Sequence, residues 1–172
     1  MKKLLLLAVL GMAPLLNAQE GFKLGAHGGI PLGDFNDMVG LVFGADVGYA
    51  WAPNKTFDVG VKTGLVHGFP ETFRDEVIRE RLPSVDFVPL AATFRVWPGT
   101  TFSFGADIGT AISLKDEVEG GFYYRPQLGI QVGAGSEVNF SYSVIETDSA
   151  TWSTVTFGFA YTFLSKRTLR GR

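Results

Sequence analysis

The stretch TVTFGFAYTF (residues 154–163) alternates two kinds of side chain. Every second residue is large and apolar, and the residues between them are Thr, Gly or Ala, all of them small. This period of two is that of a β-strand, whose successive side chains point to opposite faces. A strand in a soluble sheet usually sets its apolar face against a core and longer polar side chains toward water. Because the second face here has so little bulk, the first question is which face lies inside.

The same alternation recurs seven more times along the chain. The other segments that show it are 21–32, 41–51, 57–69, 85–97, 101–114, 123–134 and 137–145. Their lengths are close to the roughly 9–11 residues with which a tilted strand crosses a bilayer. Pro89 lies within one of them and predicts an edge or a bulge at that point.

The connections between these segments alternate in length. Tight turns rich in Pro, Gly and Asn are expected at 52–56, 98–100 and 135–136. Longer, more polar loops are expected at 33–40, 70–84, 115–121 and 146–152. Short turns at one end and long loops at the other are typical of an up-and-down membrane barrel. The sequence therefore predicts an all-β fold, an eight-stranded antiparallel up-and-down transmembrane β-barrel.

In such a barrel the small and charged face is expected inside and the large apolar face outside, in hydrocarbon. In water, eight such apolar faces would far exceed the exposed patch that a soluble monomer tolerates. The alternative is a soluble, lipocalin-like barrel with its apolar face inward around a ligand. That barrel would leave a solvated face with few Lys or Glu residues, whereas solvated faces usually carry more charge.

Charged residues of both signs fall on the predicted inner face. They are Lys23, Asp46, Asp58, Lys62, Arg95, Asp107 and Arg125. Opposite charges in a narrow lumen predict an ion-pair network, which either fills the barrel as a plug or opens as the gate of a small pore. His27 is also expected to point inward, and His67 is expected near the outer end of the third strand.

Aromatic residues flank the predicted turns, as an interfacial belt requires. The expected belt residues are Tyr49, Trp51, Phe57, Trp97, Phe102, Tyr161 and Phe163.

The N-terminus is typical of a secretory signal peptide. Lys2 and Lys3 precede an apolar run of about 13 residues, and a small residue at Ala18 predicts cleavage between Ala18 and Gln19. The predicted organisation is a signal peptide at 1–18, a barrel at 19–164 and a basic periplasmic tail at 165–172. With a periplasmic N-terminus, the long loops would lie outside the cell.

The sequence offers little that points to catalysis or to cofactors. It has no cysteine, and no His, Asp or Glu cluster has metal-ligand spacing. No enzyme activity and no cofactor are therefore expected, and nothing suggests nucleic-acid binding. The Asp- and Asn-containing loop at 33–38 lacks the pattern of a calcium-binding EF-hand loop. The charged segment 71–82 is either a solvated outer loop or a contact for lipopolysaccharide phosphates or a partner through Arg74, Arg79 and Arg81.

Residues 85–114, VDFVPLAATFRVWPGTTFSFGADIGTAISL, resemble the middle of the small outer-membrane β-barrel proteins of Bacteroidetes-type bacteria, which include PorT-like proteins. GIPLGDF at 29–35 and the aromatic final strand are similar too. The resemblance implies a barrel like the transmembrane part of OmpA-like proteins, in the outer membrane of a Gram-negative cell. It also implies that Phe159, Tyr161 and Phe163 are read by the barrel-insertion machinery.

The expected function is that of an integral outer-membrane barrel with a filled lumen and a structural or surface-interaction role. Two alternatives stay open: an accessory subunit of protein secretion or transport, as in PorT-like proteins, and a narrow gated pore. The expected partners are outer-membrane lipid, lipopolysaccharide, the insertion machinery and a secretion or periplasmic protein.

Overall fold

The computed structural model describes residues 20–33, 39–70, 84–115 and 118–164. The predictions for the signal peptide and its cleavage site, for most of the loop at 33–38, for the charged segment 71–82 and for the tail at 165–172 fall outside these residues.

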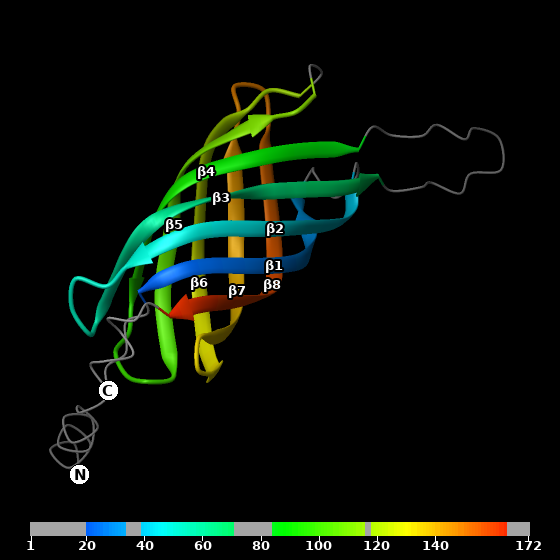
Figure 1. The fold of residues 1–172 in the computed structure, drawn as a ribbon. Coiled ribbons are helices and arrows are strands. Elements are labelled where there is room, and N and C mark those ends of the chain that lie inside the picture. Colours follow the sequence, from blue (N-terminus) through cyan, green and yellow to red (C-terminus); the bar gives the residue numbers. More distant parts are fainter. Residues whose placement is uncertain (1–19, 34–38, 71–83, 116–117, 165–172) are drawn as a thin grey trace, which may run out of the picture.

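The chain forms one closed, all-antiparallel barrel in which each strand pairs with its neighbours in sequence and β1 pairs with β8 (Figure 1). The strands are β1 (Gly21–Leu32), β2 (Val39–Trp51), β3 (Phe57–Pro70), β4 (Val85–Val96), β5 (Phe102–Ser113), β6 (Gly121–Gly133), β7 (Ser136–Glu146) and β8 (Thr151–Leu164). The predicted fold class is confirmed. β8 begins three residues earlier than predicted, since a tight turn from Thr147 to Ala150, closed by a backbone hydrogen bond of 2.9 Å, joins it to β7.

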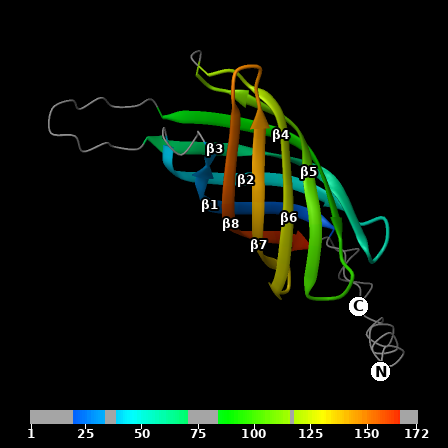
Figure 2. The same ribbon diagram turned by 180° about the vertical axis from the view of Figure 1, so that it is seen from behind.

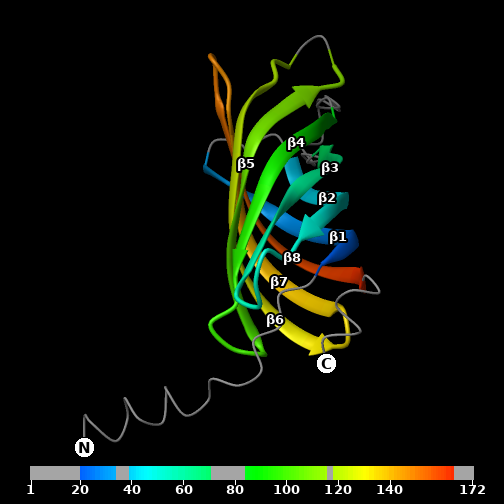
Figure 3. The same ribbon diagram turned by 60° about the vertical axis from the view of Figure 1, so that its left-hand side comes forward.

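The two ends of the barrel differ. The end that carries the short connections 52–56, 97–101 and 134–135 is called the turn end, and β1 begins and β8 ends there (Figure 1). The opposite end, called the loop end, carries the longer β1–β2, β3–β4 and β5–β6 connections together with the tight β7–β8 turn, so the expectation of a long loop at 146–152 is wrong. Seen from behind, β5–β8 form the near wall and cross β1–β3 of the far wall at a steep angle (Figure 2). Figure 3 shows the two walls side-on, both curved around a common interior. Strong strand tilt of this kind is what closing a sheet into a small barrel requires.

The outer face of this barrel is apolar. Phe104, Phe140 and Phe159 are 52%, 52% and 47% exposed, whereas Asp58, Arg95 and Asp107 are buried. The predicted orientation, with large apolar side chains outward and ionised ones inward, is therefore confirmed. The lipocalin-like alternative, which places the apolar face inside, is wrong for this chain.

Two prolines interrupt strand pairing without changing its register. Pro89 lies in β4, and the pairing of β3 with β4 stops after Thr63–Leu90 and resumes at Val66–Phe87. The β6–β7 pairing is interrupted in the same way beside Pro126. A proline has no backbone N–H to donate to the neighbouring strand. The expectation of an edge at Pro89 is wrong, because β4 pairs on both sides; Thr63 Oγ1 donates a hydrogen bond to the Pro89 carbonyl, 2.9 Å away, within the interruption.

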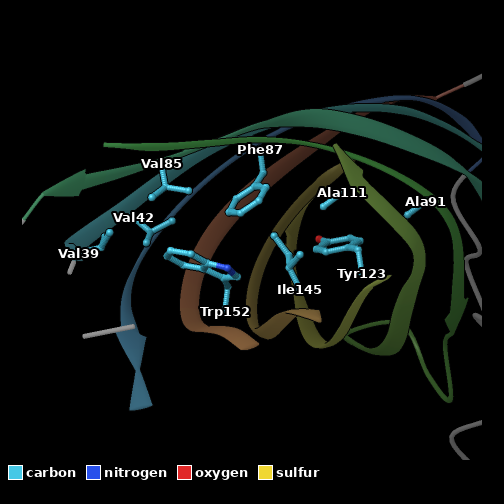
Figure 4. Close-up of a cluster of buried hydrophobic side chains, with 9 residues drawn as sticks. All are labelled: Val39, Val42, Val85, Phe87, Ala91, Ala111, Tyr123, Ile145 and Trp152. Atoms are coloured by element: carbon cyan, nitrogen blue, oxygen red, sulfur yellow. The ribbon is translucent and has the colours of Figure 1, made fainter. Parts of the chain in front are cut away.

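The hydrophobic core lies inside the barrel at the loop end (Figure 4). Its buried members are Val39, Val42, Val85, Phe87, Ala91, Ala111, Tyr123, Ile145 and Trp152. The prediction that the inner face is small or charged throughout is therefore wrong for this half. Val39 joins the cluster because a register shift between Val39 and Leu41 reverses the alternation at the start of β2. Among the described residues, no helix is long and apolar enough to cross a membrane.

Candidate functional site

The turn-end half of the lumen holds a network of charged side chains, called here the lumen network. All seven residues predicted for it lie on the inner face, and they come from β1 through β6. Each of the seven makes at least one ion pair across or along the lumen. Because every second side chain of each strand points inside, polar residues of six strands meet in the turn-end half of the lumen.

Asp46 is the centre of one part of the network. Arg125 Nη1 of β6 lies 3.0 Å from Asp46 Oδ2 of β2, a contact that crosses the interior. Lys62 Nζ lies 3.5 Å from the same oxygen and also pairs with Asp107. His27 Nδ1 lies 3.3 Å from Asp46 Oδ2, so the predicted inward orientation of His27 agrees with the structure. One carboxylate of β2 therefore contacts side chains of three other strands, β1, β3 and β6.

Arg95 is the centre of a second part. It pairs with Glu137 of β7, and its Nη2 donates to Gln127 Oε1 at 2.8 Å. Gln127 Nε2 in turn donates to Asp107 Oδ1 at 3.0 Å, which joins the two parts. Ser103 Oγ donates to the Glu137 carboxylate at 3.3 Å.

Sequence reasoning missed Glu137. It is the first residue of the predicted segment 137–145 and shares the inward parity of Asn139 and Ser141, and that parity is the signal that could have found it. With Glu137 included, the described lumen network has four cations (Lys23, Lys62, Arg95 and Arg125) and four anions (Asp46, Asp58, Asp107 and Glu137). The formal charge is thus balanced, as buried charges require if neither sign is to be left uncompensated.

Trp97 corrects the predicted aromatic belt. It is 0% exposed, and its indole Nε1 donates to Asp58 Oδ2 at 2.9 Å inside the lumen. Lys23 Nζ lies 3.7 Å from the same carboxylate oxygen. Trp97 follows Arg95 by two residues and keeps its inward parity, so it helps fill the turn end of the lumen instead of facing outward.

The remaining belt residues are on the outside. Tyr49, Trp51, Phe57, Phe102, Tyr161 and Phe163 all lie at the turn end. The Tyr49 and Trp51 rings are tilted by 58° with their centroids 5.0 Å apart, and Tyr161 lies edge-on to Phe163 at 4.9 Å. Phe159, expected with Tyr161 and Phe163 to form the insertion signal, is exposed on the same face.

The loop half of the lumen is closed by apolar side chains. Phe87 and Trp152 meet edge to face with centroids 5.8 Å apart, and Tyr123 and Ile145 point into the same interior (Figure 4). A cavity of about 20 Å³ remains among them. A second cavity of about 40 Å³ lies in the lumen network beside Asp46 and Asn139. That volume is enough for about three water molecules, and Asp46 Oδ1 and Asn139 Oδ1 are buried without a hydrogen-bond partner in the protein. The described interior therefore holds small cavities at two levels.

Metal ligands do not gather in the part of the chain that the structure describes. No group of three or more His, Cys, Asp or Glu side chains there could hold an ion. His67 lies at the loop end of β3 on the outer face, where the sequence placed it, with Nδ1 2.5 Å from Asp86 Oδ1.

Comparison with solved structures identifies the fold. The crystal structure of Ail, the attachment invasion locus protein of Yersinia pestis, matches with a TM-score of 0.58 at 14% identity, covering 86% of this chain and 99% of that one. Ail in a phospholipid bilayer nanodisc matches at 0.54 and 14%, covering 84% and 100%. A de novo designed transmembrane β-barrel matches at 0.53 and 11%, covering 84% and 97%.

The fold is that of the eight-stranded membrane barrels. At these identities the likeness shows the architecture and not a shared activity. No protein-family model matches the chain, and no curated protein matches it.

We expect Glu137→Gln to destabilise the barrel strongly. It would leave the Arg95 guanidinium buried without its counter-charge, and breaking a buried ion pair costs about 3–5 kcal/mol. Urea unfolding of the refolded protein, followed by tryptophan fluorescence, measures the loss. The matched control is Glu119→Gln, since Glu119 is exposed; that variant should change stability by less than about 0.5 kcal/mol. Equal effects for the two variants would contradict the role of Glu137.

We expect Gly129→Ala to disrupt the same contact sterically. A Cβ at Gly129 would overlap the Glu137 carboxylate and the Ser103 hydroxyl. Overpacking of this kind costs about 1–3 kcal/mol. Gly99→Ala is the control, because nothing lies within 4 Å of a Cβ built there. The same urea titration should show a clear loss for Gly129→Ala alone, and an unaffected Gly129→Ala variant would show that the wall can relax around the pair.

Proposed function

We propose that the protein is an integral outer-membrane β-barrel with a closed lumen, whose role is structural or is exerted through its outward surface. The observation that carries this proposal is the outer face. It presents large apolar side chains along all eight strands, including Leu24, Phe43, Leu90, Phe104, Ile130, Phe140 and Phe157. Soluble proteins do not leave such a surface in water, whereas a closed barrel with an apolar exterior has every strand paired and can lie in hydrocarbon.

Aromatic pairs near both ends of the barrel support the same placement. At the turn end these are Tyr49 with Trp51 and Tyr161 with Phe163. At the loop end Phe43 packs edge-on against Phe69 at 5.9 Å, and Phe122 lies 6.0 Å from Tyr124. Aromatic girdles at both interfaces are typical of transmembrane barrels. The apolar zone between them is the part that would contact lipid tails.

The filled lumen favours a structural or surface-interaction role over transport of solutes. The charge-balanced lumen network occupies the turn half, and the cluster around Phe87 and Trp152 occupies the loop half. An eight-stranded barrel has an interior just wide enough for side chains. The runner-up function is a narrow pore; what favours it is the polar cavity of about 40 Å³, which rearranged ion pairs could extend.

The partners follow from this placement and are part of the proposal. Membrane lipid would surround the barrel, and the insertion machinery would read its aromatic final strand. The accessory role in secretion that a PorT-like protein would have stays a prediction, which co-purification of a defined periplasmic or secretion subunit would test.

Membrane fractionation followed by gel electrophoresis with and without boiling tests the proposal. A closed barrel resists unfolding in cold detergent, so the unboiled protein should migrate differently from the boiled one, and it should fractionate with the outer membrane. Recovery from the soluble periplasm, or identical migration of the two samples, would overturn the proposal.

We expect the purified barrel to be silent in planar lipid bilayers, because both halves of its lumen are filled. Discrete channel openings that disappear in Arg95→Ala or Asp107→Ala would establish the gated pore instead. Heat-modifiability of each variant is the control, since a misfolded barrel would also lose its openings.

We expect a charge on the outer wall to cost more at mid-height than at the end. Ile108 lies in the middle of β5 and Phe102 begins the same strand; both are exposed on the outer face. Ile108→Arg should destabilise the protein in lipid vesicles by about 2–4 kcal/mol, and Phe102→Arg by about 0–1 kcal/mol. Urea titration in vesicles measures both. Equal costs at the two positions would show that this wall does not lie across a bilayer.

A further inference from the structure

Four side chains at the loop end form a polar group on the outside of the barrel, called here the rim cluster: His67, Ser84, Asp86 and Lys115. His67 of β3 and Asp86 of β4 are directly paired across the strands, with Nδ1 2.5 Å from Oδ1. Lys115 follows the end of β5, and its Nζ donates to Ser84 Oγ at 2.6 Å and lies 3.7 Å from Asp86 Oδ2. The cluster thus joins three neighbouring strands.

The rim cluster faces the same way as the apolar wall. His67 has the parity of Leu65 and Phe69, and the His67 ring lies edge-on to Phe69 at 4.4 Å. Asp86 has the parity of Leu90, which is also outward. Along the described strands, outward positions hold just three Asp, Glu, Lys, Arg or His residues, namely His67, Asp86 and Glu146, and all three lie at the loop end. Charge on this wall is therefore confined to one border of the apolar zone.

Lys115 and Ser84 keep donor capacity that the described residues do not use. An ammonium has three N–H donors, and one of those of Lys115 is directed to Ser84. Ser84 Oγ accepts that bond, which leaves its own O–H free to donate. Its printed contacts include no acceptor for that hydrogen. A cation beside a hydroxyl donor is a combination that binds a phosphate oxygen.

The apolar neighbours indicate where such a phosphate would come from. Leu114, next to Lys115 in sequence, is 60% exposed, and Ile112 is exposed on the same wall below it. Acyl chains packed against these two side chains would carry their headgroup to the level of Lys115. A soluble phosphate would gain nothing from them.

We propose that Lys115 and Ser84 bind the phosphate of a membrane-lipid headgroup at the loop end of the barrel. This inference rests on the proposed placement in a membrane. Asp86 pairs with His67 and lies beside Lys115, so it balances the Lys115 charge before lipid binds. Its carboxylate also repels a phosphate at that distance, so it limits the affinity.

The test is native mass spectrometry of the refolded full chain titrated with phosphatidylglycerol, whose phosphate is its sole charge, and with diacylglycerol, which lacks the phosphate. Wild type should retain phosphatidylglycerol in preference to diacylglycerol. Lys115→Gln should weaken that retention by about fivefold, and Ser84→Ala should weaken it less. The matched control is Lys55→Gln, which removes an exposed lysine of the turn end and should change nothing.

Asp86→Asn separates binding from a merely structural role. Removing the carboxylate removes the repulsion, so retention of phosphatidylglycerol should rise, opposite in sign to Lys115→Gln. A fall in both variants, or equal retention of the two lipids by wild type, would overturn the inference. Heat-modifiability of the same samples tests the two proposals separately. If the wild type is heat-modifiable but does not prefer phosphatidylglycerol, the headgroup site is contradicted and the proposal of a membrane barrel is not.

Discussion

The antiparallel pairing of β1 with β8, which runs from Gly21–Leu164 to Leu32–Ser153, leaves the sheet without an edge. In hydrocarbon an unpaired backbone N–H or C=O costs several kcal/mol, since no water can replace the missing partner. Every other feature of the barrel therefore depends on the closure of the sheet. Once the sheet is closed, alternate side chains of every strand point into the lumen or outward toward hydrocarbon, so each strand must have one face suited to each of these two environments.

The two faces meet different physical requirements. The outer face needs apolar surface area, which Phe, Leu and Ile provide, and these side chains need no hydrogen-bond partners in lipid. The inner face of an eight-stranded barrel has little room, so small residues let a few long ones cross it. Arg125 reaches Asp46 on β2 from β6, and Arg95 reaches Glu137 on β7 from β4. Each of these pairs spans the interior and ties walls that share no backbone hydrogen bonds, with the signs in balance.

The interior is layered along its axis. Charged groups occupy the turn half, where Trp97 binds Asp58, and aromatic and aliphatic groups occupy the loop half. The two prolines interrupt pairing beside this boundary: Pro89 lies between Phe87 and Ala91 of the apolar cluster, and Pro126 lies between Arg125 and Gln127 of the polar part. Register is kept through both interruptions because the pairing on the other side of each strand continues.

The sequence by itself determined the strands, their alternation, most of the connection lengths and the outward direction of most Phe residues, because a period of two is a local property and the bulk of each face can be counted. It also placed Lys23, Asp46 and Arg125 on the inner face. The tertiary structure alone decided which of these groups meet, since partners such as Arg125 and Asp46 are 79 residues apart in the chain. It alone turned Val39 inward at a register shift, brought Trp97 to Asp58 and Glu137 to Arg95, and gathered Phe87, Ile145 and Trp152 from three strands into one cluster. Those outcomes depend on closure and on the height at which each strand enters the barrel, and no single segment contains either quantity.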